Sequence, residues 1–163
     1  MNHSSLANGF TLLEVMIALV IFSIGLLGLA GLQGLSVQNN QVSYSRTVAN
    51  QLAYDMADRI RNNKTANYAG GIPGAQPASC ITSAADCSPN DLAQYDLYEW
   101  DQTLKDKNNN LSGVEGSVTV NGAGYLVAIG WDEKHAGLVG PYDCTATPPT
   151  PAGVECVKIV VIP

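Results

Sequence analysis

The chain has 163 residues, 13% of which are charged, and a formal net charge of −6. The acidic excess lies entirely beyond Asn63, where eleven acidic residues accompany five lysines. A surface of that sign repels nucleic-acid phosphates and matches anionic lipid headgroups poorly, so a dedicated nucleic-acid-binding protein is disfavoured. The length predicts one compact domain plus any segment that lies outside it.

A long apolar segment begins near the N-terminus. No charged side chain occurs between Glu14 and Arg46, and Ser23 is the one polar residue in 15–32. The run from Phe10 exceeds the roughly 20 apolar residues that cross a bilayer core. It is longer than the apolar region of a secretory signal, and a plain anchor does not explain an acid near its start. Such a carboxylate needs a partner, for which the helix dipole or a nearby free amine are the candidates.

The stretch GFTLLE at 9–14 resembles the processing motif of type IV prepilins and the related pseudopilins. This resemblance implies that a prepilin peptidase cleaves between Gly9 and Phe10 and methylates the new N-terminus. Residues 1–9 would then be the leader peptide, although it lacks the Lys or Arg that such leaders usually carry. Glu14 would become the fifth mature residue, which can pair with the N-terminal amine of a neighbouring subunit.

The helix is expected to continue to about Arg61, because its second half has an amphipathic period. Asp55 and Arg59 stand four residues apart, the spacing of a helical ion pair. The apolar positions recur every four residues, at Val48, Leu52, Met56 and Ile60.

Four glycines recur at three-residue intervals inside this helix, at Gly25, Gly28, Gly31 and Gly34. Small residues allow close packing between helices in a membrane. Each glycine also weakens a helix by up to about 1 kcal/mol relative to alanine. The pattern therefore fits close packing or local flexibility.

Residues 64–163 read as a small domain rich in turns. Strands are expected over 117–120, 124–131 and 157–162, and Asn121-Gly122 is a hairpin-turn signal between the first two. The segment 91–104 is expected to hold a short helix or irregular structure. A three- or four-stranded antiparallel sheet on the amphipathic helix would bury both apolar faces, which is an α+β architecture.

This arrangement resembles the type IV pilin fold, in which the apolar half of the helix protrudes. The expected organisation comprises a leader peptide, a transmembrane and filament-core helix, an amphipathic helix half and a globular head domain. Their ranges are 1–9, 10–33, 34–63 and 64–163.

The four cysteines allow three pairings, and an even number in an exported domain favours disulfides. We favour the local pairs Cys80–Cys87 and Cys144–Cys156, because each closes a loop without secondary structure. A zinc site is the rival, but the spacings lack the C-x₂₋₄-C pattern and only His135 remains after processing. We therefore expect no metal.

Two other clusters carry candidate chemistry. Asp132, Glu133 and His135 combine carboxylates with an imidazole, but residues placed directly after a strand most often form a solvated turn. Alternating Asp and Asn in 106–110 resemble a calcium loop that lacks its glycine and its final glutamate, so an ordered turn is expected. We predict no enzymatic activity and no cofactor.

The runs SIGLLGLAGLQ at 23–33 and MADRIRNN at 56–63 resemble the V-type minor pilins, or type IV pilus modification proteins. This resemblance implies a priming complex with other minor pilins, joined to the major pilin through the N-terminal helix and to a tip adhesin. It further implies residence in the inner membrane with a periplasmic C-terminal domain, followed by the pilus, and a contribution to adhesion and motility. A minor pseudopilin of a type II secretion system is the alternative. A pilus-borne DNA receptor would carry a basic stripe that is missing here.

Overall fold

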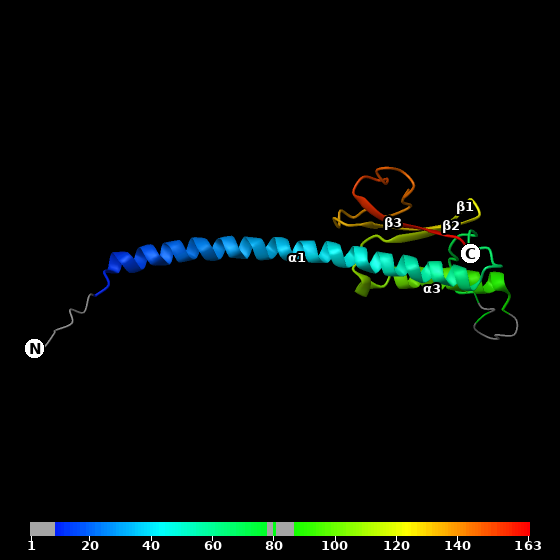
Figure 1. The fold of residues 1–163 in the computed structure, drawn as a ribbon, viewed down its shortest axis with the longest axis horizontal. Coiled ribbons are helices and arrows are strands. Elements are labelled where there is room, and N and C mark those ends of the chain that lie inside the picture. The colour runs from blue at the N-terminus through cyan, green and yellow to red at the C-terminus, as the bar shows by residue number, and fades with distance from the viewer. Residues whose placement is uncertain (1–8, 78–79, 81–86) are drawn as a thin grey trace, which may run out of the picture. The chain divides into compact units, whose positions relative to one another are not determined.

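The fold is given by a computed structural model, which describes residues 9–77, 80 and 87–163. The chain divides into two compact units, Met1–Gln41 and Val42–Pro163. The elements are α1 (Leu12–Asn62), α3 (Pro89–Leu104), the 3₁₀ helix η2 (Lys107–Asn109), and the strands β1 (Glu115–Asn121), β2 (Gly124–Asp132) and β3 (Val154–Val161) (Figure 1).

The part of α1 in the first unit contains the apolar run 15–32 and is exposed on every side, since residues 9–41 are all solvent-exposed. The hydroxyl of Ser23 donates a hydrogen bond to the Leu19 carbonyl at 2.7 Å. The single polar side chain of this apolar run is therefore satisfied within the helix, as a lipid environment requires. The predicted helix is confirmed, with a start two residues after Phe10.

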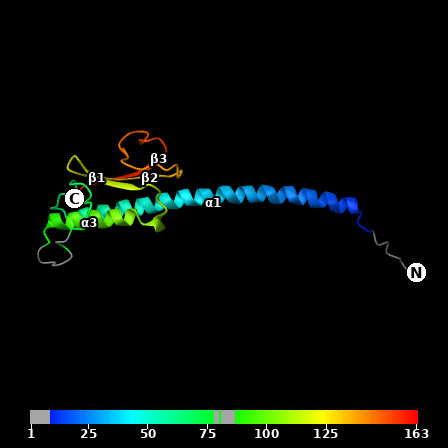
Figure 2. The same ribbon diagram turned by 180° about the vertical axis from the view of Figure 1, so that it is seen from behind.

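The part of α1 in the second unit carries the predicted apolar stripe. Val48, Met56 and Ile60 are buried and Leu52 is half-buried. Burial begins at Ser45, and α3 lies beside this part of α1 (Figure 2). The indole N–H of Trp100 in α3 donates to the Leu52 carbonyl at 2.8 Å, which joins the two helices through the core.

Helix α3 covers the segment 91–104, for which a short helix or irregular structure was expected, and begins two residues earlier, at Pro89. Ser88 caps it: its hydroxyl accepts from the Asp91 N–H at 3.2 Å, and the Asp91 carboxylate accepts from the Ser88 N–H at 3.2 Å. Pro89 occupies the first turn, where its missing N–H costs nothing. The sequence SPND carried this capping box, with Asp where Glu or Gln is usual.

The sheet has three antiparallel strands in the order β1-β2-β3 within the described residues. The predicted hairpin is confirmed: Asn121 pairs with Gly124, and Gly122 has a φ of 60°. Glycine at the first central position is the pattern of a type II′ turn. Strand β3 begins at Val154, three residues earlier than expected, because its first residues pair with the end of β2.

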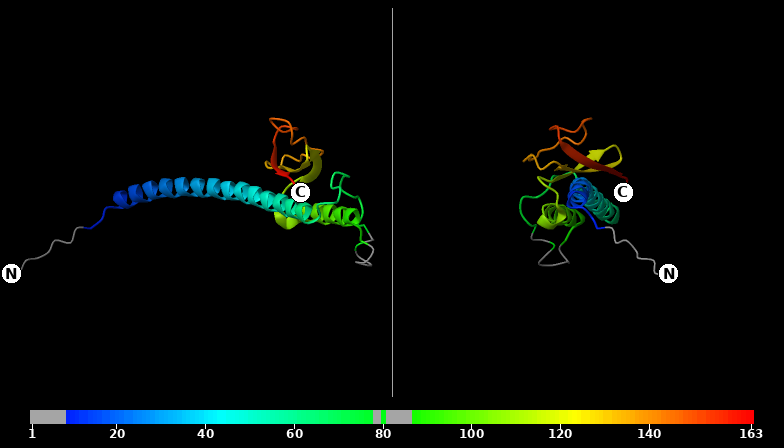
Figure 3. Two further views of the ribbon diagram at one scale, coloured as in Figure 1. Left: turned by 45° about the vertical axis from the view of Figure 1, so that its right-hand side comes forward. Right: turned by 90° about the vertical axis from the view of Figure 1, so that its left-hand side faces the viewer.

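One face of the sheet packs on the two helices, as the end-on view in Figure 3 shows. The core combines α1 and α3 side chains with those of alternating strand residues, including Val118, Val127, Ile129, Trp131 and Val161. The predicted α+β architecture, a long N-terminal helix packed on a small antiparallel sheet, is confirmed.

Both local disulfides are present, Cys80–Cys87 and Cys144–Cys156. The second ties the loop after β2 to strand β3. That loop covers the other face of the sheet, where a Cβ added at Gly130 would lie 2.8 Å from the Tyr142 ring and 3.1 Å from the Cys144 sulfur. Glycine at this position therefore permits the close approach of the loop.

Gly116 faces the core at an equally tight point. A Cβ there would lie 2.4 Å from the Trp100 ring and 2.5 Å from the Leu104 side chain. We expect Gly116→Val to lower the free energy of unfolding by about 1–3 kcal/mol, the usual cost of overpacking a core. Urea unfolding followed by tryptophan fluorescence measures this, with Ser117→Val on the exposed face as the control. An unchanged midpoint in Gly116→Val would contradict this packing.

Candidate processing and assembly site

The predicted cleavage junction lies outside the helix. Gly9 and Phe10 precede α1 in irregular structure, and Phe10 is 85% exposed. An added Cβ at Gly9 would meet no atom within 4 Å. A peptidase needs an accessible, non-helical bond, because a helical backbone would first have to unfold. The Gly9–Phe10 bond meets both conditions.

Thr11 caps the helix directly after the junction. Its carbonyl accepts from the Glu14 N–H at 3.1 Å and from the Val15 N–H at 3.3 Å, and its hydroxyl accepts from the Glu14 N–H at 3.3 Å. Thr11 and Glu14 thus hold the N-cap and N3 positions of the T-x-x-E capping pattern. Thr11 was not among the predicted site residues, although its spacing to Glu14 is a signal in the sequence.

Glu14 lies in the first turn, where the helix dipole favours a negative charge. Its side chain borders an apolar hollow of about 570 Å³ on the helix surface. It is the one charged residue among the described residues there, since the others that line the hollow are Phe10, Val15, Ala18, Leu19 and Phe22. The arrangement offers a partner an apolar contact surface with a single carboxylate.

The segment that follows is the one described helix long and apolar enough to cross a membrane, by length and composition. Its four glycines have open space around them, because a Cβ added at any of them would meet nothing within 4 Å. Both interpretations of the glycine pattern therefore remain compatible with this helix.

A comparison with known families agrees with the geometry of the junction. Residues 5–30 match the prokaryotic N-terminal methylation motif, a stretch that includes Gly9, Phe10 and Glu14. Together with the α+β fold, this match supports a type IV pilin-like protein, the class of pilins and pseudopilins. No curated protein and no solved structure matches the chain.

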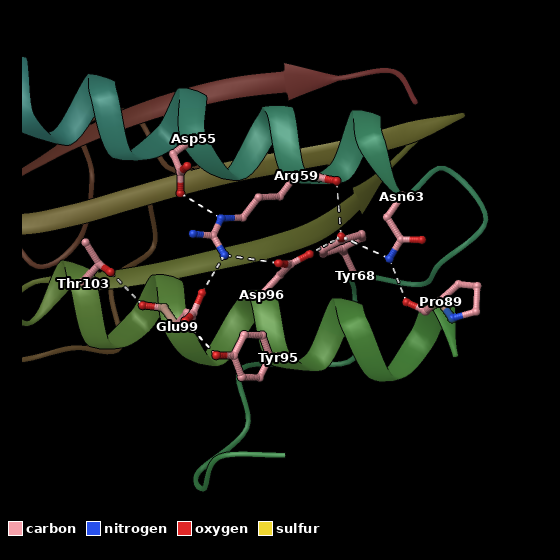
Figure 4. A network of polar contacts seen from close by, with 9 residues as sticks. All are labelled: Asp55, Arg59, Asn63, Tyr68, Pro89, Tyr95, Asp96, Glu99 and Thr103. Carbon is pink, nitrogen blue, oxygen red and sulfur yellow. Dashed lines mark hydrogen bonds and ion pairs between the residues drawn. The ribbon is translucent and has the colours of Figure 1, made fainter. Parts of the chain in front are cut away.

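A polar network holds α1 against α3 in the second unit (Figure 4). The Arg59 guanidinium contacts Asp55 at 2.9 Å, which confirms the predicted ion pair, and also Asp96 at 3.2 Å and Glu99 at 3.3 Å. The Tyr68 hydroxyl donates to Asp96 at 2.7 Å, and burial together with this hydrogen bond raises the pKa of Tyr68. The network joins α3 to the part of α1 that lies in the second unit.

Asp132, Glu133 and His135, which lie close together in the sequence, each have a different environment in the structure. Asp132 is fully buried and accepts from the N–H groups of Gly137 and Leu138 at 2.8 and 3.1 Å. Glu133 pairs with Arg46 of α1 at 2.9 Å, and His135 is exposed in the turn. These contacts organise the loop after β2.

The predicted turn at 106–110 contains η2. Asp106 accepts from the Asn108 N–H at 2.9 Å, and Asn110 adopts the left-handed conformation. Within the described parts of the chain, no group of three or more His, Cys, Asp or Glu residues could hold a metal ion.

Asp132 should make stability depend on acid pH. Burial raises its pKa, but the backbone N–H donors lower it more, so the pKa lies below its ordinary value. A lowered folded-state pKa contributes stability above the unfolded pKa of about 3.9, which is lost as the pH falls through the folded value. We expect Asp132→Asn to lower the urea midpoint at pH 7 and to weaken its acid dependence.

The measurement is urea unfolding of the full chain in detergent between pH 2 and 7. Glu155→Gln is the control, since this half-exposed carboxylate of β3 makes a surface ion pair with Arg46 at 3.5 Å. Equal acid dependence in Asp132→Asn and the parent would refute the contribution of this carboxylate.

Proposed function

We propose that this protein is a minor pilin, a structural subunit that helps initiate assembly of a type IV pilus within a priming complex. The observation that carries the proposal is the prepilin-type motif, placed at an accessible junction before an exposed apolar helix that continues into an α+β domain. Adhesion and twitching motility would depend on it indirectly, through the number of pili that a cell assembles.

In this proposal the chain enters the inner membrane through its apolar helix, with the C-terminal domain in the periplasm. Prepilin peptidase cleaves after Gly9 and methylates the amine of Phe10. The chain then leaves the membrane for the pilus, where its apolar helix packs among those of other minor pilins and the major pilin. A tip adhesin would join the same complex.

Glu14 has a specific task in this assembly. Cleavage creates an amine at Phe10, and the carboxylate of Glu14 in one subunit pairs with the amine of its neighbour. Both charges leave water when the helices pack, so each needs the other, because an unpaired charge in an apolar core is strongly destabilising.

We propose a structural function without enzymatic activity. The acidic excess beyond Asn63 also disfavours a nucleic-acid partner. An exposed apolar helix that continues into a packed α+β domain suits a structural subunit of a filament.

The test compares a deletion strain with strains that carry the parent gene or the Gly9→Phe variant. We expect the deletion to reduce surface pili and twitching, with rescue by the parent gene alone, and we expect the mature protein in sheared pili. Normal piliation combined with a defect in protein secretion would instead establish a pseudopilin of a type II secretion system.

A further inference from the structure

Strand β1 forms an open edge of the sheet. It pairs with β2 on one side only, and no described residue pairs with its other side. The pair Asn121–Gly124 closes a two-residue hairpin, so the bonded pairs are those of Asn121 and every second residue before it. The backbone N–H and C=O groups of Gly116, Val118 and Val120 therefore point away from the sheet.

A groove of about 410 Å³ runs along this edge. One wall is β1, from Glu115 to Thr119, and the other is the loop that contains Tyr68, Gly71 and Ile72, with Leu97 of α3 also lining it. The groove places free backbone groups next to an apolar wall, which is the combination that binds an extended peptide.

The two edge strands of the sheet, β1 and β3, differ in the features that hinder the addition of another strand. Proteins guard edge strands with lysine, proline, bulges or covering loops. Strand β3 carries the exposed Lys158, and a disulfide at Cys156 ties a loop to it. The β1 sequence EGSVTVN has neither lysine nor proline, and its pairing with β2 continues without a bulge. The β1 edge thus lacks lysine, proline and a bulge, and the loop beside it leaves a groove along residues 115–119.

We propose that the β1 edge binds an extended, non-acidic strand of a different protein, which adds a fourth strand to the sheet. Alternating outward backbone groups can be satisfied by another strand but not by a helix, whose backbone groups bond internally. The acidic excess beyond Asn63 disfavours an acidic strand, and Glu115 is the one charged residue among the described residues that line the groove. This inference goes beyond the proposed function, and only its rejection of a second copy rests on the membrane insertion proposed above.

A second copy of the chain fits this edge less well. Two β1 strands that pair antiparallel in one sheet are related by a two-fold axis normal to the sheet. That axis reverses the direction of the α1 segment packed on the sheet, so two chains inserted in one membrane in the same orientation cannot pair in this way. Two copies would also bring two acidic domains together.

The test measures amide hydrogen exchange by NMR on the full chain in detergent. The probe is the capped peptide KTVTVTK, with a version N-methylated at alternate residues as its control. In the free protein, the amides of Gly116, Val118 and Val120 should exchange faster than those of Ser117 and Thr119. Saturating peptide should slow the three outward amides by at least about tenfold, and the methylated peptide should not.

Two variants separate binding from folding. Val120→Pro removes an outward N–H, which an edge strand tolerates, and should weaken peptide binding about tenfold or more while keeping the urea midpoint. Val120→Thr keeps the N–H and should bind like the parent.

Each of three results would overturn the proposal. One is the absence of slowing at millimolar peptide, and another is equal slowing by the methylated peptide. The third is protection of the outward amides in the free chain, accompanied by a dimeric mass in light scattering, which would assign the edge to a second copy.

Discussion

Replacement of Gly9 by phenylalanine should leave the protein in the membrane as an uncleaved precursor. A glycine before the scissile bond lets the peptidase backbone approach closely, and a large side chain would displace the reacting carbonyl. A displacement of about 1 Å costs roughly a hundredfold in rate. Intact-mass analysis of the membrane fraction should show the chain with its nine leader residues attached.

The matched control is Gly74→Phe, which makes the same change at a loop glycine with open space around it. This variant should be processed normally. A mature-sized product from Gly9→Phe would show that cleavage occurs elsewhere, and the assignment of Phe10 as the mature N-terminus would be wrong.

Replacement of Glu14 by alanine should spare membrane insertion and cleavage but reduce incorporation into the filament by at least about tenfold. The amine of a neighbouring subunit would lose its carboxylate partner inside an apolar core, and removing one member of a buried pair is more costly than removing both. Quantitative immunoblotting of sheared filaments against the membrane pool gives the ratio.

Two further variants isolate the charge. Glu14→Gln keeps the size of the side chain and should fail nearly as badly as Glu14→Ala. Asp58→Ala removes an exposed carboxylate from the same helix, where it pairs with Arg61 on the surface, and should assemble normally. Undiminished incorporation of Glu14→Ala would remove this carboxylate from the mechanism.

Local signals predicted most elements of the fold. The helix was expected because its first half is continuously apolar and its second half has a clear period, and both properties reside in contiguous residues. The hairpin at Gly122 was expected for the same reason, since a two-residue turn depends on its own backbone. The start of β3 was missed because Val154 and its neighbours become a strand by pairing with β2, which their own sequence does not reveal.

The candidate site likewise contains residues that local sequence signals predicted and features that they did not. Gly9, Phe10 and Glu14 were identified because the processing motif is linear and is followed at once by its apolar segment. Thr11 was overlooked although its spacing to Glu14 is a capping pattern. The β1 edge groove could not have been predicted, because it depends on where a loop lies beside a strand more than forty residues further along the chain.

The sequence by itself determined the apolar helix and the processing motif before it, because each depends on composition or on residues close together in the chain. It favoured the two local disulfides among three possible pairings, and the structure decided for them. The tertiary structure alone decided the partners of Arg59 on α3, the hydrogen bond from Trp100 to α1 and the burial of Asp132. These contacts join residues that are brought together only when the helices and the sheet pack. Their geometry follows from that packing, and sequence periodicity describes only the face that each element buries.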